Sequence, residues 1–338
     1  MTDDVHVTRT GRVGRIILTR TKALNALNLS MVEQINAALD GWASEDLRAI
    51  TIESASDRAF CSGGDIRQVR QNTLDGRPEE SDRFFATEYE VNAKLGDHPV
   101  PIVSLIDGIC MGGGLGISVH GPFRVVTSNA SFAMPETRIG FFPDVGGSYF
   151  LPRLPGHIGA YLGLTGARID AADALAIGMA THLVAPADLT TIPDLLAAHD
   201  GPIDSVLRAL APDIGLPSTL MTHREQIDHC FGAATVTGII ERLERDGSPW
   251  AQGTLEMLHA VSPQSLAVTL ELMAWGRERS LTDCLAMERA AARDVVLSAD
   301  FIEGVRAALV DKDRAPTWSE FTGPVDSRAW LDSPPPPF

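Results

Sequence analysis

Residues 101–114 read PIVSLIDGICMGGG, an apolar run that ends in three consecutive glycines. The part from Pro101 to Ile106 predicts a buried strand, because apolar residues that do not alternate with polar ones are typical of strands covered on both faces. Gly112–Gly114 follow, and the apolar residues up to Val119 predict a helix after the glycines. In α/β folds, a glycine loop between a strand and a helix is a common place for ligand binding.

The same order of elements recurs through the N-terminal half. Three more segments rich in β-branched residues predict strands: 13–19 (VGRIILT), 48–53 (RAITIE) and 123–127 (FRVVT). A second glycine-bearing loop, residues 60–65 (FCSGGD), follows the strand at 48–53. Ser30 and Glu33 have the spacing of a capping box and predict a helix start with Ser30 as its N-cap. Strands joined through helices favour a parallel sheet or a stacked spiral of such units, so we predict an α/β fold.

Helical patterns dominate from about residue 203 onwards. Ser262 before Pro263 predicts one helix start, and the stripe formed by Leu281, Leu285, Glu288 and Ala292 predicts another helix. A Pro- and Asp-rich stretch at residues 189–214 precedes this region. We therefore predict a domain at residues 1–200 and a helical region at residues 201–338 that ends in the loose proline-rich tail SPPPPF.

Residues 72–83 form an acidic segment that contains glycine and proline. A helix is predicted after it, at residues 84–95. The segment has two interpretations, a mobile lid over a ligand or a disordered loop.

Composition restricts the class of protein. The 338 residues contain 28 Lys and Arg against 44 Asp and Glu, a net charge of −16 that argues against nucleic acid and anionic membranes as partners. The sequence contains no run of about 18 apolar residues, so no membrane span is predicted. The acidic first residues resemble neither a signal peptide nor a transit peptide. Four scattered cysteines without metal-ligand spacing predict free thiols, no metal site and a cytoplasmic location: Cys61, Cys110, Cys230 and Cys284.

The two glycine loops leave two interpretations open. Neither has the spacing of a phosphate-binding loop. The glycines either allow close packing between strand and helix or expose two backbone N–H groups that converge as an oxyanion hole. Such a hole would stabilise negative charge on a carbonyl oxygen.

Residues 134–147 (MPETRIGFFPDVGG) place two carboxylates in apolar surroundings. Burial of Glu136 or Asp144 would cost desolvation free energy and raise the pKa of the carboxyl group, which suits a general acid, a general base or a buried nucleophile. The alternative is a pair that caps a helix or forms salt bridges. Arg138 lies between them, and it either lowers their pKa values as a partner or is exposed to solvent.

Together these segments resemble the crotonase (enoyl-CoA hydratase/isomerase) superfamily. The resemblance runs through residues 22–27 (KALNAL), 60–66 (FCSGGDI), 111–114 (MGGG) and 135–147 (PETRIGFFPDVGG). It implies a spiral of ββα units with a helical C-terminal region. It also implies an acyl-CoA thioester as substrate, with the thioester oxygen held in an oxyanion hole by the amides of Gly64 and Gly113.

A narrower resemblance is to the 3-hydroxyisobutyryl-CoA hydrolase branch of that superfamily. It is carried by residues 135–154 (PETRIGFFPDVGGSYFLPRL), 262–273 (SPQSLAVTLELM) and 299–318 (ADFIEGVRAALVDKDRAPTW). The implied reaction is hydrolysis of 3-hydroxyisobutyryl-CoA to 3-hydroxyisobutyrate and CoA, a step in valine catabolism. The resemblance implies that Glu136 and Asp144 are the catalytic carboxylates and that Glu88 contacts the substrate.

Two positions argue against a hydratase. Enoyl-CoA hydratases carry a second glutamate where this chain has Gly116, and usually a glycine where it has Asp144. The alternative reaction is that of an enoyl-CoA isomerase or hydratase-like crotonase with Glu136 as its base. A third hypothesis is a non-catalytic protein that binds acyl-CoA.

The resemblance also implies how CoA binds. The backbone around Lys22, Ala23 and Leu24 and the loop with Ser62, Asp65 and Ile66 would hold adenosine and pantetheine. Lys22 is either a phosphate contact or a solvated surface lysine. CoA is part of the substrate, so no separate cofactor is expected. Because members commonly form trimers or dimers of trimers, a homo-oligomer is a further expectation.

Overall fold

The computed structural model describes residues 4–212 and 217–321. Contacts group the chain into two compact units that are interleaved in sequence. Unit 1 comprises Met1–Gly64, Glu90–Phe132 and Ile169–Met221, and unit 2 comprises Asp65–Tyr89, Ala133–Arg168 and Thr222–Phe338. This division does not coincide with the boundary predicted between residues 200 and 201, which stays a prediction.

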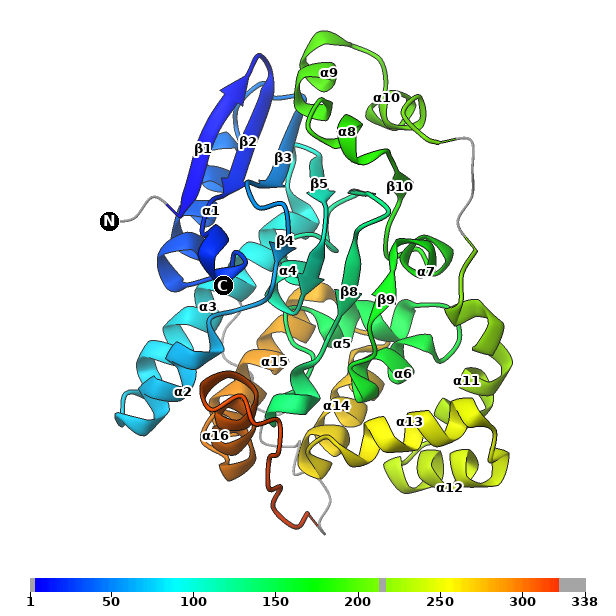
Figure 1. The fold of residues 1–338 in the computed structure, drawn as a ribbon. Coiled ribbons are helices and arrows are strands. Elements are labelled where there is room, and N and C mark those ends of the chain that lie inside the picture. Colours follow the sequence, from blue (N-terminus) through cyan, green and yellow to red (C-terminus); the bar gives the residue numbers. More distant parts are fainter. Residues whose placement is uncertain (1–3, 213–216, 322–338) are drawn as a thin grey trace. The chain divides into compact units, whose positions relative to one another are not determined.

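Unit 1 contains a six-stranded sheet with the order β1-β2-β3-β5-β7-β10 (Figure 1). Its strands are β1 (Val5–Thr10), β2 (Val13–Leu18), β3 (Ala49–Ser54), β5 (Ile102–Ile106), β7 (Phe123–Val126) and β10 (His182–Leu183). β1 and β2 form an antiparallel hairpin, and the other neighbours are parallel. The four strands expected from the sequence are confirmed. β1 was not predicted, because most of its residues are polar and only Val5 is fully buried.

A second sheet has the order β4-β6-β8-β9. Its strands are β4 (Ala59–Cys61), β6 (Ile109–Met111), β8 (Ser131–Ala133) and β9 (Ile169–Asp170). β4 and β6 are parallel, so both glycine loops leave the sheet at the same edge. Gly114 follows β6, and a Cβ atom added to it would lie 2.5 Å from the carbonyl oxygen of Cys61. The close-packing interpretation is therefore correct for this glycine.

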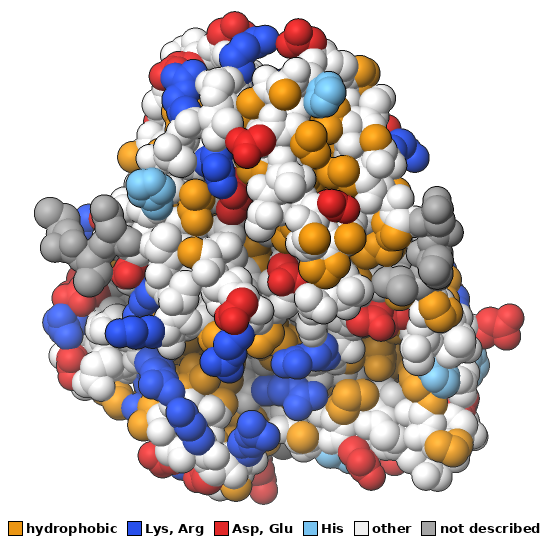
Figure 2. All heavy atoms as spheres, turned by 45° about the horizontal axis from the view of Figure 1, so that its top comes forward, with side chains coloured by type: hydrophobic (Ala, Val, Ile, Leu, Met, Phe, Trp, Pro, Cys, Tyr) orange, Lys and Arg blue, Asp and Glu red, His pale blue; other side chains and the backbone are white. Residues whose placement is uncertain are grey.

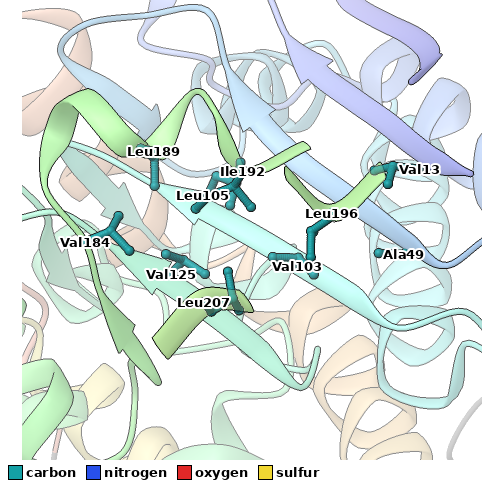
Figure 3. Close-up of a cluster of buried hydrophobic side chains, with 10 residues drawn as sticks. All are labelled: Val13, Ala49, Val103, Leu105, Val125, Val184, Leu189, Ile192, Leu196 and Leu207. Carbon is teal, nitrogen blue, oxygen red and sulfur yellow. The ribbon is translucent and has the colours of Figure 1, made fainter. Parts of the chain in front are cut away.

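The core of unit 1 lies between the six-stranded sheet and three short helices. These helices are α8 (Pro186–Leu189), α9 (Ile192–Ala198) and α10 (Ile203–Arg208). Figure 3 shows their side chains pointing onto one face of the sheet. The buried cluster consists of Val13, Ala49, Val103, Leu105, Val125, Val184, Leu189, Ile192, Leu196 and Leu207. The stretch at 189–214, which the sequence suggested as a boundary, therefore contributes to this core.

The remaining helices of unit 1 include α1 (Leu29–Trp42), α4 (Gly113–Gly116) and α7 (Ala171–Ala176). The predicted N-cap of α1 is wrong by two residues. Asn28 has an extended backbone, and its side chain accepts a hydrogen bond from Met31 N at 2.9 Å. Ser30 already lies inside the helix, where its hydroxyl accepts from the Gln34 amide at 3.2 Å.

Unit 2 is mostly helical. Its helices are α2 (Ile66–Leu74), the first part of α3 (Pro78–Asp97), α5 (Gly147–Phe150), α6 (Ile158–Thr165), α11 (Arg224–Phe231), α12 (Val236–Asp246), α13 (Pro249–His259), α14 (Pro263–Gly276), α15 (Leu281–Val295) and α16 (Ala299–Val305). Short 3₁₀ turns occur in the two units at Thr21–Ala23, Glu136–Ile139, Leu151–Arg153 and Leu220–His223, and a π-helical turn at Arg306–Val310. The start predicted at Ser262 is confirmed, since its side chain accepts from Ser265 N.

Residues 72–83 are part of the helical structure. They contain the end of α2 and the start of α3, which begins six residues before the predicted helix. Asp82 forms ion pairs with Arg289 at 3.0 Å and Arg293 at 2.7 Å, both from α15. These contacts contradict the interpretation of the segment as a disordered loop.

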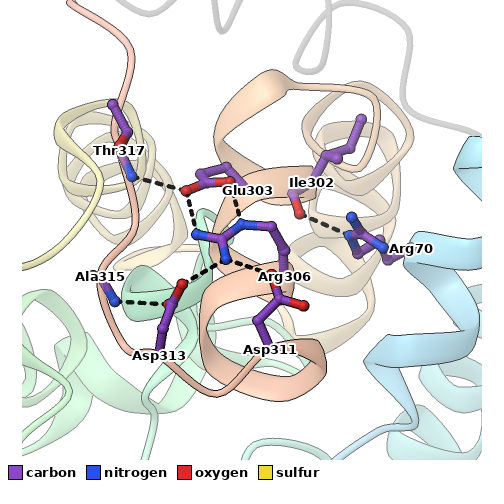
Figure 4. Close-up of polar contacts among 8 residues, drawn as sticks. All are labelled: Arg70, Ile302, Glu303, Arg306, Asp311, Asp313, Ala315 and Thr317. Atoms are coloured by element: carbon purple, nitrogen blue, oxygen red, sulfur yellow. Dashed lines mark hydrogen bonds and ion pairs between the residues drawn. The ribbon is translucent and has the colours of Figure 1, made fainter.

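The chain after α16 is bound to the end of that helix. Figure 4 shows Arg306 bonded to Glu303, Asp311 and Asp313 at 2.6–2.8 Å. Glu303 also accepts a hydrogen bond from Thr317 N at 3.0 Å. The charge network thus fastens the extended residues that follow the π-helical turn. The proline-rich tail at 333–338 lies outside the described residues.

Membrane-spanning helices and metal-binding clusters are absent from the described residues. No helix among them is long and apolar enough to cross a membrane. No group of three or more His, Cys, Asp or Glu side chains in this part of the chain is arranged to hold a metal ion.

Candidate active site

The two glycine loops of unit 1 are neighbours. Gly63 follows β4 with φ at +111°, a conformation that suits glycine. A Cβ atom added to it would lie 3.4 Å from the Met111 carbonyl oxygen and 3.8 Å from Gly113 N. The loop that contains Gly64 therefore passes directly beside the start of α4.

Each loop provides one of the predicted amide donors. Gly112 has φ +47° and ψ −118°, which turns the chain so that Gly113 begins α4. The first N–H groups of a helix have no acceptor within the helix, so the Gly113 amide is available to a ligand. Gly64 lies on the adjacent loop, in a parallel bridge with Leu27. Two neighbouring backbone amides of this kind can stabilise a carbonyl oxygen that gains negative charge.

The predicted CoA-binding segments of unit 1 also come together. Ser62 N donates to the Leu24 carbonyl at 3.0 Å, and the Ser62 hydroxyl lies 3.5 Å from the Ala23 carbonyl. Leu24 is held at φ +51° and ends the 3₁₀ turn Thr21–Ala23, which contains Lys22. Lys22 is exposed, which agrees with both interpretations of that residue. Asp65 and Ile66 are the first residues grouped with unit 2 and lie at the start of α2.

Unit 2 contains a group of buried acidic side chains. Glu88 and its neighbour Tyr89 lie on α3, Glu136 begins a 3₁₀ turn, Asp144 lies in the loop before α5, and Glu288 lies on α15. All five side chains belong to residues that are less than 9% exposed. The structure thus places the two predicted catalytic carboxylates and the predicted substrate contact, Glu88, in one unit.

Asp144 is hydrogen-bonded to Tyr89. The Tyr89 hydroxyl donates to Asp144 Oδ2 at 2.7 Å. Burial raises the pKa of Asp144 from 3.8 to about 7, although the bond from Tyr89 opposes this rise. Burial, followed by the charge of Asp144, raises the pKa of the Tyr89 hydroxyl well above its usual value. Tyr89 therefore stays protonated and can serve as a permanent donor to Asp144.

Buried surroundings disfavour the charged form of Glu136 and of Glu88. Burial raises the pKa of Glu136 well above its usual value, and repulsion from Asp144 raises it further. Burial and Asp144 have the same effect on the pKa of Glu88. Glu136 Oε2 and Glu88 Oε1 have no hydrogen-bond partner among the described residues. Buried polar atoms usually have a partner, so these two oxygens are suited to bind water or substrate.

An aromatic cluster explains the low polarity around these carboxylates. The rings of Phe85 and Phe141 stack at 5.7 Å, and Phe141 stacks on Phe142 at 4.4 Å. Phe85 also packs against Tyr89 at 5.8 Å. The apolar residues that the sequence places around Glu136 and Asp144 are thus buried together.

Arg138 does not pair with either carboxylate. Its exposed guanidinium donates to the Thr165 carbonyl at 3.2 Å. Within the described part of the chain, no Lys or Arg forms an ion pair with Glu136 or Asp144, so the salt-bridge interpretation of this pair is wrong. Cys61 is buried, with its sulfur 3.1 Å from the Asn25 carbonyl oxygen.

Tyr89 and Glu288 were not predicted from the sequence to belong to the group of buried side chains around Asp144. Tyr89 has no signal beyond its position next to Glu88. Glu288 did have one, because it interrupts the apolar stripe of the predicted helix at residues 281–292. A glutamate in such a stripe is buried with the stripe and needs hydrogen-bond donors.

Similarity to known proteins establishes the family to which the chain belongs. A family model described as enoyl-CoA hydratase/isomerase matches residues 13–329. The chain belongs to this family. The solved structures similar to it include two of nearly the same length, which confirms the crotonase fold expected from the sequence.

Two curated proteins that are similar to the chain are the mitochondrial 3-hydroxyisobutyryl-CoA hydrolases of Homo sapiens and Rattus norvegicus. They are 42% and 41% identical to the chain, with 94% of the chain and 84% of each relative covered. A crystal structure of a carnitinyl-CoA dehydratase from Mycobacterium thermoresistibile has a TM-score of 0.91 at 38% identity, with 99% and 98% covered. An enoyl-CoA hydratase structure from Rhodobacter sphaeroides has a TM-score of 0.87 at 38% identity, with 97% of both chains covered.

Proposed function

We propose that this protein is an acyl-CoA thioester hydrolase that cleaves 3-hydroxyisobutyryl-CoA to 3-hydroxyisobutyrate and CoA in valine catabolism. The observation that carries the proposal is the identity of 41–42% to curated hydrolases of this name over 94% of the chain. The buried pair of Glu136 and Asp144 supports it, because thioester hydrolysis needs a nucleophile or base and a proton donor.

The reaction adds water across the thioester bond. A C–O bond forms at the thioester carbon, the C–S bond breaks, and the sulfur leaves with a proton as the CoA thiol. Glu136 either attacks the carbon to form an anhydride that water then hydrolyses, or it takes a proton from the water that attacks directly. Both routes require the ionised form of Glu136, which its raised pKa makes strongly basic.

We assign the thioester oxygen to the amides of Gly64 and Gly113. One such donor typically contributes about 3–4 kcal/mol to stabilisation of the transition state. Asp144 has three candidate tasks: it binds the 3-hydroxyl group of the substrate, positions Glu136, or gives a proton to the departing sulfur. Glu88 is assigned as a further contact to the substrate. No cofactor has a part in this scheme, since CoA belongs to the substrate.

CoA binding is assigned to unit 1 residues around Lys22 and Ser62 and to the following residues Asp65 and Ile66. The phosphates of CoA need local positive charge on an acidic chain. Figure 2 shows Lys and Arg side chains gathered in the lower part of the face that it draws, so basic surface exists despite the net charge of −16. We retain a cytoplasmic location and a homo-oligomer as proposals, whereas the curated relatives are named as mitochondrial proteins.

A hydratase or isomerase is the competing function. The names of the two similar solved structures, a dehydratase and a hydratase, favour it. Gly116 opposes it, because this buried position in α4 provides no second carboxylate to hold the water. An absorbance assay of the double bond with crotonyl-CoA would detect that activity. An acyl-CoA-binding protein without catalysis would be inactive in both assays.

The first test is CoA-thiol release from 3-hydroxyisobutyryl-CoA, followed with a thiol reagent. We expect rapid release by wild type and losses of about 100-fold or more in Glu136→Gln and Asp144→Asn. Glu79→Gln is the matched control, since Glu79 is an exposed glutamate on α3, and it should keep full activity. No release from this substrate or from 3-hydroxypropionyl-CoA would exclude the hydrolase.

The route of attack requires a second measurement. Turnover in ¹⁸O-labelled water, followed by mass spectrometry of the peptide that contains Glu136, tests the anhydride route. Label in that carboxyl group indicates an anhydride that water opens at the Glu136 carbon. An unlabelled carboxyl group after many turnovers excludes that route and leaves direct attack by water or an anhydride that water opens at the acyl carbon.

A further inference from the structure

Glu288 is a buried carboxylate that the proposed reaction does not use. It lies on α15 with no exposed surface. Its Oε2 accepts from Gly146 N at 2.7 Å, and its Oε1 accepts from Ser148 N at 2.8 Å and from the Ser148 hydroxyl at 2.5 Å. A buried carboxylate is costly unless donors satisfy it. Here all the donors come from one short loop, the loop that follows Asp144.

That loop has a strained backbone. Val145 has φ +51° and Gly146 has φ +85°, and Gly147 N donates to the Asp144 carbonyl at 2.7 Å to close the turn. The left-handed conformation is strained for an L-residue, and a β-branched valine rarely adopts it. Such strain persists only where the surrounding structure enforces it. The two amides on either side of Gly147 are both fixed by Glu288.

Two contacts therefore determine where the carboxylate of Asp144 lies. Tyr89 fixes its side chain from α3. Glu288 fixes, from α15, the turn in which its backbone lies. Both anchors and Asp144 belong to unit 2, so the arrangement does not depend on the position of unit 1.

We propose that Glu288 is a positioning residue for thioester hydrolysis, which holds the strained turn at Val145 and Gly146 and thereby aims Asp144 at the reacting group. This inference rests on the proposed hydrolase function, because it concerns the aim of a carboxylate assigned to that reaction. Glu288 acts through this turn, since both of its carboxylate oxygens accept hydrogen bonds from Gly146 and Ser148.

Conservative substitutions separate the parts of this contact. Glu288→Gln keeps the size of the side chain but replaces one acceptor oxygen with an NH₂ group, which cannot accept from a backbone amide. Glu288→Asp keeps both oxygens on a shorter side chain. Ser148→Ala removes the hydroxyl contact and leaves both backbone amides bonded to Glu288. The proposal requires both substitutions of Glu288 to be more damaging than Ser148→Ala, which leaves the two backbone contacts in place.

A double-mutant cycle with Asp144 tests whether Glu288 acts through that residue. Glu288→Gln should lower kcat for thiol release by about tenfold or more, with KM changed less than about twofold. In the Asp144→Asn background the same substitution should cost less than about twofold, because the group that it aims is already lost. Equal losses in both backgrounds would show general structural damage and would overturn the proposal.

Hydrogen exchange gives a second readout that does not depend on the reaction. The amides of Gly146 and Ser148 should be protected in wild type and should exchange at least about tenfold faster in Glu288→Gln, while Tm and the protection of the α15 amides stay unchanged. Unchanged protection of the peptide with residues 144–150 would overturn the proposal. If wild type released no thiol, the proposed function would fail, and this exchange measurement would still decide whether Glu288 holds the turn.

Discussion

At the scale of single residues, Asp144 combines function with a cost in stability. Its pKa rises from 3.8 to about 7 on folding because burial disfavours the charge. A group with a raised folded-state pKa binds its proton more tightly in the native state, so its contribution to stability is complete below pH 3.8. That contribution falls as the pH rises and is lost once the pH passes about 7. Above that pH the native protein carries an unfavourable buried charge.

Asp144→Asn should therefore stabilise the fold at a pH where it lowers activity. Asparagine can still accept the bond from Tyr89 but carries no charge. We expect the free energy of unfolding to rise by roughly 1–3 kcal/mol at pH 8, with the gain shrinking towards zero near pH 4. Urea unfolding of both proteins at several pH values measures this. A gain independent of pH would contradict the explanation.

Tyr89 is the residue that favours the charged form of Asp144. The hydrogen bond from the Tyr89 hydroxyl lowers the pKa of Asp144, whereas burial raises it. In Tyr89→Phe, the pKa of Asp144 should rise further. If Asp144 acts in its ionised form, by binding the 3-hydroxyl group or by positioning Glu136, the acidic limb of the plot of kcat/KM against pH should move to higher pH, with a loss of about tenfold at pH 7 and a smaller loss at pH 9. If Asp144 gives a proton to the departing sulfur, the basic limb should move to higher pH instead. Tyr149→Phe, at a partly exposed tyrosine beside Arg153, is the control and should leave the profile unchanged.

At the scale of elements, the close approach of two strands positions the amides of unit 1. Gly114 belongs to α4, and its hydrogen faces the Cys61 carbonyl at the end of β4. Gly113, the proposed donor, is its neighbour. The backbone spacing between β4 and α4 therefore limits this position to glycine.

Gly114→Ala should be destabilising, since its Cβ would lie 2.5 Å from a backbone oxygen. We expect a loss of about 2–4 kcal/mol in unfolding free energy and a fall in kcat from displacement of the Gly113 amide. Gly41→Ala is the matched control. Gly41 lies in α1 with nothing within 4 Å of an added Cβ, so alanine there should stabilise by up to about 1 kcal/mol. Equal effects of the two substitutions on Tm would refute this explanation.

Elements with a strong local signal were predictable from sequence. The apolar runs of β2, β3, β5 and β7 identified the strands, and Ser262 with Pro263 marked a helix start correctly. Predictions were less accurate where two local signals competed. Asn28 caps α1 instead of Ser30, because Asn28 is the residue with an extended backbone at the helix start and its side chain accepts from Met31 N.

The site could be predicted only in part, for a physical reason. Glu136, Asp144 and Glu88 followed from the family resemblance, and the structure places all three among the buried acids of unit 2. Tyr89 and Glu288 make contacts with the Asp144 loop from residues 55 and about 140 positions away. Contacts between such distant residues depend on the packing of α3 and α15, which local sequence patterns do not specify.

At the scale of the whole molecule, the net charge of −16 opposes binding of an anionic CoA ester. Charges separated by more than the Debye length, about 10 Å at 0.1 M salt, are largely screened, whereas contacts at shorter range are not. Low concentrations of salt should therefore weaken the general repulsion more than they weaken any contact between a local cation and the CoA phosphates.

Because salt screens the repulsion between the acidic protein and CoA, we expect kcat/KM for the CoA thioester to rise by roughly twofold when the salt concentration increases from 10 to 100 mM. The pantetheine thioester of the same acid carries no phosphate and should show no change over this range. Lys22→Ala should raise KM for the CoA thioester alone if Lys22 contacts a phosphate, and it should change neither substrate if that lysine is only solvated. A fall in kcat/KM for the CoA thioester between 10 and 100 mM would show that local positive charge already outweighs the net charge at long range.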